Sequence, residues 1–290
     1  MATASSILDD TRSKFGDTAK NFITDALGLT WLDQGQKELS WELRPLRRMK
    51  GYTVSANQDS FATPDDVILP EVVGHLRQIR RTLRRVTPGE YRQQQSMAQN
   101  AVGEPVIWTE IDGRIYVWPR YSTASLTTTV NASTTAAATS VTMSSTGNLR
   151  SYGMVTVDSE EMEYTAKTST TITGVRRGIG GTTAATHVSA ATVTQLDFEM
   201  IYARHATSLA SQVDELEIKE VWHYPLLQYY VMYCAYMAEG SKDKAEHMYQ
   251  MWRAGIERSK EVEKRRHSAG PLGVSDIMTQ RVSGLYGPTS

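Results

Sequence analysis

The sequence has almost no cysteine, and it lacks the short motifs that mark common enzyme and metal sites. Its one cysteine, Cys234, excludes a disulfide within the chain and lies in an apolar helical pattern that favours a buried thiol. The histidines are dispersed, with no H-E-x-x-H or C-x-x-C spacing. There is also no G-x-x-x-x-G-K-[ST] loop and no G-x-S-x-G turn. We therefore expect no catalytic residue, no metal, no cofactor and no enzymatic activity.

Long apolar runs and a strong net charge are missing as well. The chain has 31 Lys+Arg against 32 Asp+Glu, a net charge of −1, which gives it no general attraction for nucleic acid. No apolar stretch approaches membrane-spanning length, and no basic segment followed by an apolar run opens the sequence. We expect a protein that folds in a cytoplasm and does not enter a membrane. Its 290 residues allow one large domain or two modest ones.

The clearest structural signal is a β-hairpin within Glu104–Pro119. Asp112-Gly113 separates two runs of β-branched and aromatic residues, which is the strongest short hairpin signal. A two-residue turn would pair Ile111 with Arg114, and Ile107 with Trp118. Both faces of the hairpin carry large apolar groups, so it needs partners from elsewhere in the chain.

Helices are predicted on both sides of this hairpin. Ser5–Gly16 and a longer helix from Thr24-Asp25 to Leu43 show apolar residues at helical spacing, with the threonine and aspartate as N-cap residues. From Glu217 the sequence turns helical again, and Gly240-Ser241 separates two apolar stripes. This pattern predicts an αα-hairpin.

The segment 121–195 differs in composition from its surroundings. It is rich in threonine, serine, alanine and glycine, lacks proline, and contains short alternating stretches such as Met154–Val157 and Thr171–Val175. These features indicate a small all-β module. The alternating Leu196–Tyr202 would then resume the sheet left at Trp118.

The predicted fold class is α+β, a helical bundle with a small antiparallel sheet that is interrupted by an all-β module. The predicted parts are a first part of the core (1–120), the inserted β domain (121–195), a second part of the core (196–266) and a C-terminal extension (267–290). Tyr52–Asn57 alternates like a strand. One element stays open, because His75–Val86 suits either a helix or a strand. The arginines of His75–Val86 fit a nucleic-acid face, or pairing with acidic neighbours or with a partner subunit.

Several segments together resemble the head-to-tail adaptor (connector, head-completion) proteins of tailed bacteriophages. The segments that carry the resemblance are Thr24–Leu39, Leu69-Pro70, Arg80-Arg81, Val86–Tyr91, Gly103–Pro119, Trp222–Leu227 and Ala235–Gly240. The resemblance implies a virion protein of the neck, made in the host cytoplasm, that forms a ring under the portal, twelve-fold in most members. It implies contacts with the portal and with tail, nozzle or tail-tube proteins. Double-stranded DNA would pass through the ring without sequence-specific binding.

The resemblance also implies surfaces for these contacts. The C-terminal segment docks against the portal in this family, so we expect portal contacts from its apolar residues, which are Leu272, Val274, Ile277, Met278, Leu285 and Tyr286. A ring subunit needs large surfaces for its neighbours. The residues expected at the subunit interface are Arg80, Arg81, Trp108, Trp118 and Trp252.

The inserted segment has a resemblance of its own. Val157–Thr165 followed by Thr173–His187 looks like a small β module that is scattered among phage structural proteins. Most plain adaptors lack it, and inserted in a sheet loop it would project from the ring toward fibre, tail or capsid proteins. Two other classes of function stay open: a virion surface-recognition protein that binds host glycan or another virion protein through 121–195, and an enzyme.

Overall fold

The computed structural model describes residues 3–76, 81–98, 101–121, 126–218 and 224–268. The chain forms two compact units. A helical unit comprises Met1–Leu43 and Ala206–Ser290, and a strand-rich unit comprises Arg44–His205. Helices and small, mainly antiparallel sheets are both present, which confirms the predicted α+β class. The finer division into a core, an inserted domain and an extension stays a prediction.

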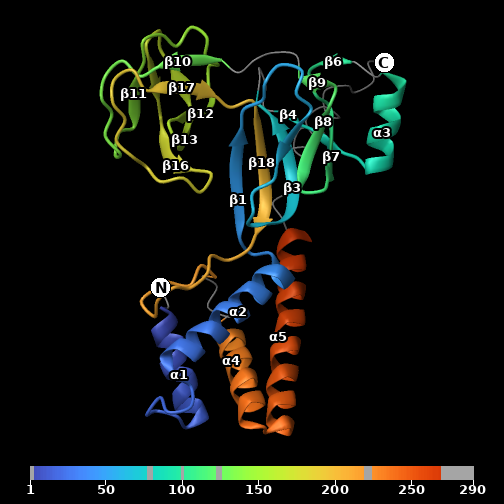
Figure 1. The fold of residues 1–290 in the computed structure, drawn as a ribbon, viewed down its shortest axis with the longest axis vertical. Helices are drawn as coiled ribbons and strands as arrows, with labels where there is room; N and C mark the ends of the chain where they lie inside the picture. The colour runs from blue at the N-terminus through green and yellow to red at the C-terminus, as the bar shows by residue number, and fades with distance from the viewer. Residues whose placement is uncertain (1–2, 77–80, 99–100, 122–125, 219–223, 269–290) are drawn as a thin grey trace, which may run out of the picture. The chain divides into compact units, whose positions relative to one another are not determined.

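The helical unit contains two helices from the N-terminal segment and an αα-hairpin from the C-terminal segment (Figure 1). They are α1 (Ala4–Phe15), α2 (Asp25–Leu43), α4 (Tyr224–Glu239) and α5 (Lys242–Ser268). Helix α1 begins where the Thr3 hydroxyl accepts a hydrogen bond from the Ser6 amide, and it ends at Gly16 with a φ of 89°. The first two helices begin and end within one residue of their predicted limits, and the αα-hairpin is present with its turn at the predicted Gly240-Ser241.

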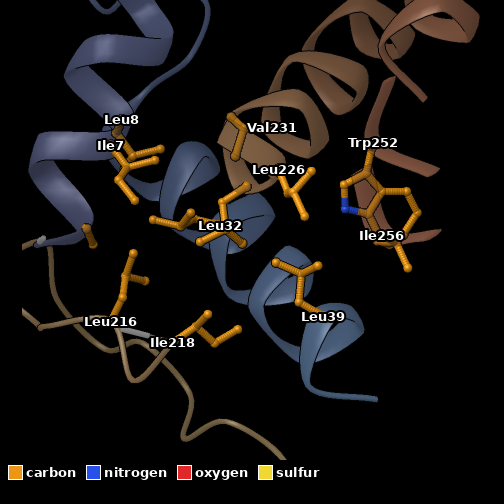
Figure 2. Packing of buried hydrophobic residues seen from close by; sticks show 12 residues of the cluster. Ile7, Leu8, Leu32, Leu39, Leu216, Ile218, Leu226, Val231, Trp252 and Ile256 are labelled. Carbon is orange, nitrogen blue, oxygen red and sulfur yellow. The ribbon is translucent and has the colours of Figure 1, made fainter. Parts of the chain in front are cut away.

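One apolar core holds these four helices together. Leu32 and Leu39 are two helical turns apart on one face of α2, and their fully buried side chains point toward Leu226 and Val231 of α4 in Figure 2. Trp252 and Ile256 of α5 belong to the same cluster. The N-terminal helices therefore reach a stable packing only with the C-terminal hairpin.

The αα-hairpin begins later than predicted. Residues 205–218 are not helical. Asp214 accepts from the amides of Ala210 and Ser211 in a local turn, and Glu217 accepts from the amide of Thr207, ten residues earlier. The prediction of a helix from Glu217 is wrong because these carboxylates stabilise a turn and a longer loop instead of a helix N-terminus.

Two sheets form the core of the strand-rich unit. The first has the order β1-β18-β3-β4, and its strands are β1 (Arg47–Tyr52), β18 (Phe198–Arg204), β3 (Val67–His75) and β4 (Arg81–Thr82). The second has the order β2-β8-β7-β5, with β2 (Ser60–Ala62), β8 (Arg114–Trp118), β7 (Ile107–Ile111) and β5 (Arg84–Arg85). A two-stranded pair of β6 (Val102–Gly103) and β9 (Arg120–Tyr121) and the helix α3 (Pro88–Met97) complete it.

The predicted hairpin is confirmed as β7 and β8. Ile111 pairs with Arg114 and Ile107 with Trp118, in the predicted register. Asp112 and Gly113 have φ values of 51° and 66°, as a tight hairpin turn of the mirror-image type requires. Its core-facing side chains pack with those of β18 and β3 in one cluster, which includes Trp108, Ile115, Val117, Phe198, Met200 and Val73.

Three strand predictions need correction. Strand β18 does not resume the sheet of the hairpin, because it pairs with β1 and β3 in the other sheet. The strand expected at Tyr52–Asn57 lies earlier, at β1, where charged residues hide its pattern. Of the two readings of His75–Val86, the described residues form the short strands β4 and β5, so the helical reading is wrong.

The segment 121–195, called the β module below, builds its own sheets (Figure 1). Its strands are β10 (Thr127–Thr129), β11 (Ser140–Thr142), β12 (Gly153–Val157), β13 (Glu160–Tyr164), β14 (Ala166–Lys167), β15 (Thr171–Thr173), β16 (Arg176–Ile179) and β17 (Thr192–Gln195). They form a five-stranded sheet, β10-β17-β12-β13-β16, and a three-stranded sheet, β11-β15-β14. Fully buried side chains such as Val157, Met162 and Ile172 form a separate core between them. The strands predicted in this segment are therefore present.

Candidate interaction surfaces

The described residues contain no group of three or more His, Cys, Asp or Glu side chains that could hold a metal ion. The one cysteine, Cys234, lies half-buried on α4, and burial raises the pKa of its thiol to about 11. It is therefore a protonated, weakly reactive thiol at neutral pH.

A buried polar cluster lies in the β module around Glu160. The Arg177 guanidinium donates to both carboxylate oxygens at 2.7 Å, and the amides of Gly178 and Ala185 donate to them at 2.9 Å. The His187 ring lies 2.9 Å from Glu160 and 2.7 Å from an oxygen of Asp158. Burial by itself would raise the pKa of Glu160, but the Arg177, backbone and His187 hydrogen bonds outweigh it and hold the pKa at about 2.

This cluster has a structural role. Its hydrogen bonds join the strand β13 to β16 and to the loop that follows β16, and the acceptor oxygens of Glu160 are fully used. A general acid or base needs an oxygen or nitrogen within reach of a substrate. Gly178 lies in β16, and Gly180 and Gly181 lie in the turn that follows this strand. Their φ values of 62° to 84° therefore belong to a strand and its turn, not to a phosphate loop opening a helix.

The predicted interface tryptophans lie inside the fold. Trp108, Trp118 and Trp252 are 1%, 5% and 4% exposed and pack in three separate cores of the chain. Their rings offer little area to a neighbouring subunit. Their assignment to a subunit interface stays a prediction. At such an interface the partner would contact residues around these tryptophans more than the buried rings.

The remaining predicted site residues lie in segments that are described only in part. The backbone of Arg81 belongs to β4, where it pairs with His75. Arg80 and the six residues expected to contact the portal lie outside the described residues. In the same arginine-rich region, Arg85 lies 3.8 Å from Glu110 and 5.1 Å from the centre of the Trp108 ring. Pairing with an acidic neighbour, one of the readings open from the sequence, therefore holds for Arg85.

The αα-hairpin carries a cluster of four aromatic rings that sequence analysis did not find. Tyr230 and Tyr233 of α4 and Tyr249 and Trp252 of α5 contact one another in a closed cycle, with ring centres 5.1 to 6.2 Å apart. Such tilted pairs add to the stability of the helix pair. In this cluster the buried Trp252 lies next to the exposed Tyr249.

Two further exposed apolar side chains lie on the same two helices. Met237 of α4 and Met251 of α5 are exposed, as is Tyr249. Methionine and tyrosine are common at protein interfaces because they adapt their shape or combine an apolar ring with a polar end. The sequence shows which residues of these helices are apolar, but it does not show which of them the rest of the fold leaves exposed.

Comparison with known proteins agrees with a virion protein. No helix in the described part of the chain is long and apolar enough to span a membrane. No curated protein matches the sequence significantly. A family model described as SU10 adaptor protein matches residues 2–166, which is more than half of the chain. This description indicates a phage structural protein that acts in the virion through contacts with other virion proteins. The chain therefore belongs to the SU10 adaptor protein family.

Proposed function

We propose that this chain is a head-to-tail adaptor of a tailed phage virion. It forms a ring beneath the portal in the neck, connects the DNA-filled head to the tail, and leaves a channel for double-stranded DNA. The observation that carries the proposal is the match of the adaptor family model to residues 2–166. A net charge of −1 agrees with a conduit, because many phosphate contacts would slow the passage of DNA.

The proposed ring is a homo-oligomer of twelve subunits. Neighbouring subunits contact each other through Arg80, Arg81 and the exposed apolar residues of the αα-hairpin, which are Met237, Tyr249 and Met251. Exposed apolar side chains that gather on one element are a common mark of a protein interface. The exposed apolar residues therefore support the αα-hairpin as an interface, and binding experiments are needed to identify the protein that contacts it.

The portal and the tail are the proposed neighbours above and below the ring. The C-terminal extension 267–290 contacts the portal through Leu272, Val274, Ile277, Met278, Leu285 and Tyr286. The opposite side of the ring receives the tail, nozzle or tail-tube proteins, and the β module contacts fibre or capsid proteins.

Native mass spectrometry of the purified chain, alone and mixed with the portal of its phage, tests the proposal. We expect one defined complex with a fixed ratio of adaptor to portal subunits. The double substitution Ile277→Asp and Met278→Asp should abolish the complex, because it places charges in the proposed portal contact. A chain that stays monomeric and does not bind the portal at micromolar concentration would refute the adaptor role.

Subunit contacts need a separate comparison. Arg80→Glu combined with Arg81→Glu should weaken the ring and leave the monomer folded, as judged by circular dichroism. Arg176→Glu is the matched control, because Arg176 is a 74% exposed arginine of the β module that the predicted interface does not include. Equal ring formation by the two variants would remove Arg80 and Arg81 from the interface.

A further inference from the structure

The buried carboxylate of Asp197 lies where the chain returns from the β module to the core sheets, and it also binds the residue where the chain leaves them. Asp197 lies two residues after the last module strand, β17, and is 1% exposed. The hydroxyl of Tyr121, the residue where the chain leaves the core, donates to Asp197 Oδ1 at 3.0 Å. Both crossings of the chain are therefore joined at Asp197.

An arginine from within the β module binds the same carboxylate. Arg150 Nη2 lies 3.0 Å from Asp197 Oδ1, and its Nη1 donates to the Leu196 carbonyl at 2.9 Å. The Arg150 side chain is 10% exposed. A buried ion pair of this kind cannot lose one partner without leaving an uncompensated charge.

A second contact lies at the free edge of the first core sheet. Strand β1 is an edge strand, and its Gly51 amide points away from β18 toward the β module. Glu161 Oε2, on the module strand β13, accepts this hydrogen bond at 3.0 Å. Burial raises the pKa of Glu161, although the Gly51 amide and Lys50 oppose the rise. The module thus satisfies an edge amide that would otherwise remain open to another strand.

A third contact is apolar. One buried cluster combines side chains of the core with side chains of the module, and its members are Leu76, Met154, Ile179, Leu196 and, partly buried, Met49. The close approach leaves no room at Gly51, where an added Cβ would lie 2.1 Å from Leu196 Cδ1. A tethered domain has solvated linkers and a polar boundary, whereas this boundary has a shared core.

We propose that the β module is a rigid extension of the core sheet, that the two unfold as one cooperative unit, and that Asp197 is the positioning residue of their joint. A partner that contacts the module is then held in a defined place relative to strands β1 and β18. This inference rests on contacts within Arg44–His205 and does not depend on the ring or on the portal.

Hydrogen exchange of the full chain, followed by mass spectrometry, tests the cooperativity. Met162→Ala removes a fully buried side chain that belongs to the module cluster. We expect exchange in the module strand β12 to become at least about 25-fold faster, and exchange in the core strand β18 to become faster by the same factor. Faster exchange in β12 with unchanged exchange in β18 would overturn the proposal.

Two arginine variants test the joint itself. Arg150→Ala removes the buried pair with Asp197, and Arg176→Ala removes a pair of similar length, 3.2 Å, in which the arginine is 74% exposed. We expect Arg150→Ala to speed exchange in both β12 and β18, and Arg176→Ala to change neither by more than about twofold. When Met162→Ala is also present, Arg150→Lys keeps a positive charge next to Asp197. Exchange in β18 should then still become faster together with exchange in β12, to a smaller degree than with Arg150. Equal effects of Arg150→Ala and Arg176→Ala would remove Asp197 as the positioning residue.

Discussion

The Glu160 cluster predicts that the β module loses stability in acid. The pKa of Glu160 is about 2 in the folded chain, against an ordinary value of 4.5. A carboxyl with a lowered pKa stabilises the fold above its unfolded value, and this stabilisation is lost as the pH falls from about 4.5 toward 2. The whole difference corresponds to at most about 3 kcal/mol, of which about 2 kcal/mol is lost between pH 7 and pH 3.

The comparison of wild type with Glu160→Gln isolates this contribution. The free energy of opening of β12 and β13 would be measured by hydrogen exchange at several pH values, with correction for the intrinsic pH dependence of exchange. Wild type should be more stable than Glu160→Gln at pH 7, and the difference should shrink by about 2 kcal/mol at pH 3. Glu163→Gln is the control, because Glu163 is on the same strand but pairs with an exposed arginine.

Two results would contradict this reasoning. A difference between wild type and Glu160→Gln that stays constant from pH 7 to pH 3 would mean that the Arg177 and amide hydrogen bonds do not favour the ionised carboxyl. An equal pH response of Glu163→Gln would mean that the effect belongs to the general charge of the module and not to the buried cluster.

Three further substitutions test the rest of the fold. Gly35→Ala places a Cβ 2.8 Å from the Tyr230 ring, so it should lower the free energy of unfolding of the helical unit by about 1–2 kcal/mol in urea, whereas Thr30→Ala on the exposed face of α2 should not. Thr87→Ala breaks the capping box of α3 and should speed amide exchange in that helix by an amount equal to about 1 kcal/mol, with the core sheets unchanged. Trp252→Ala should cost about 3–5 kcal/mol by urea unfolding, and a loss below 1 kcal/mol would contradict its place in the core.

The elements that sequence analysis predicted well are those specified by neighbouring residues. Asp112-Gly113 determines the turn of β7 and β8 by its backbone preferences, and the register of the hairpin follows from the turn. Helix α2 and the αα-hairpin follow in the same way from apolar residues at helical spacing and from Gly240. Local chemistry is sufficient for such elements.

The elements that were missed depend on distant parts of the chain. The choice of β1 and β3 as partners of β18 depends on packing across the sheet, which no local pattern reveals. Whether an apolar residue such as Trp108 faces the core or a partner also depends on what covers it. Asp197 carries no such local signal, because a carboxylate between Leu196 and Phe198 fits the polar position of an alternating strand, and its burial depends on Arg150 and Tyr121.

The candidate surfaces were predictable to a smaller extent. The sequence predicted an αα-hairpin with two apolar stripes, but the ring contacts of Tyr230 with Trp252 and of Tyr233 with Tyr249 form only when both helices are packed. The residues expected at the portal lie outside the described part of the chain, so their role rests on the family resemblance and on the proposed binding experiment.

The helical unit is divided between two segments of the chain that lie before and after the strand-rich unit, and this division sets the order in which the two units fold during synthesis. Ribosomes release α1 and α2 first, but the helices that cover Leu32 and Leu39 emerge only after all of Arg44–His205 has been made. The strand-rich unit can fold during translation, whereas the helical unit closes last. Any assembly step that uses the folded four-helix bundle therefore requires chains in which α4 and α5 have been made. Chains from earlier interrupted synthesis keep an exposed apolar face on α2 that host chaperones and proteases can recognise.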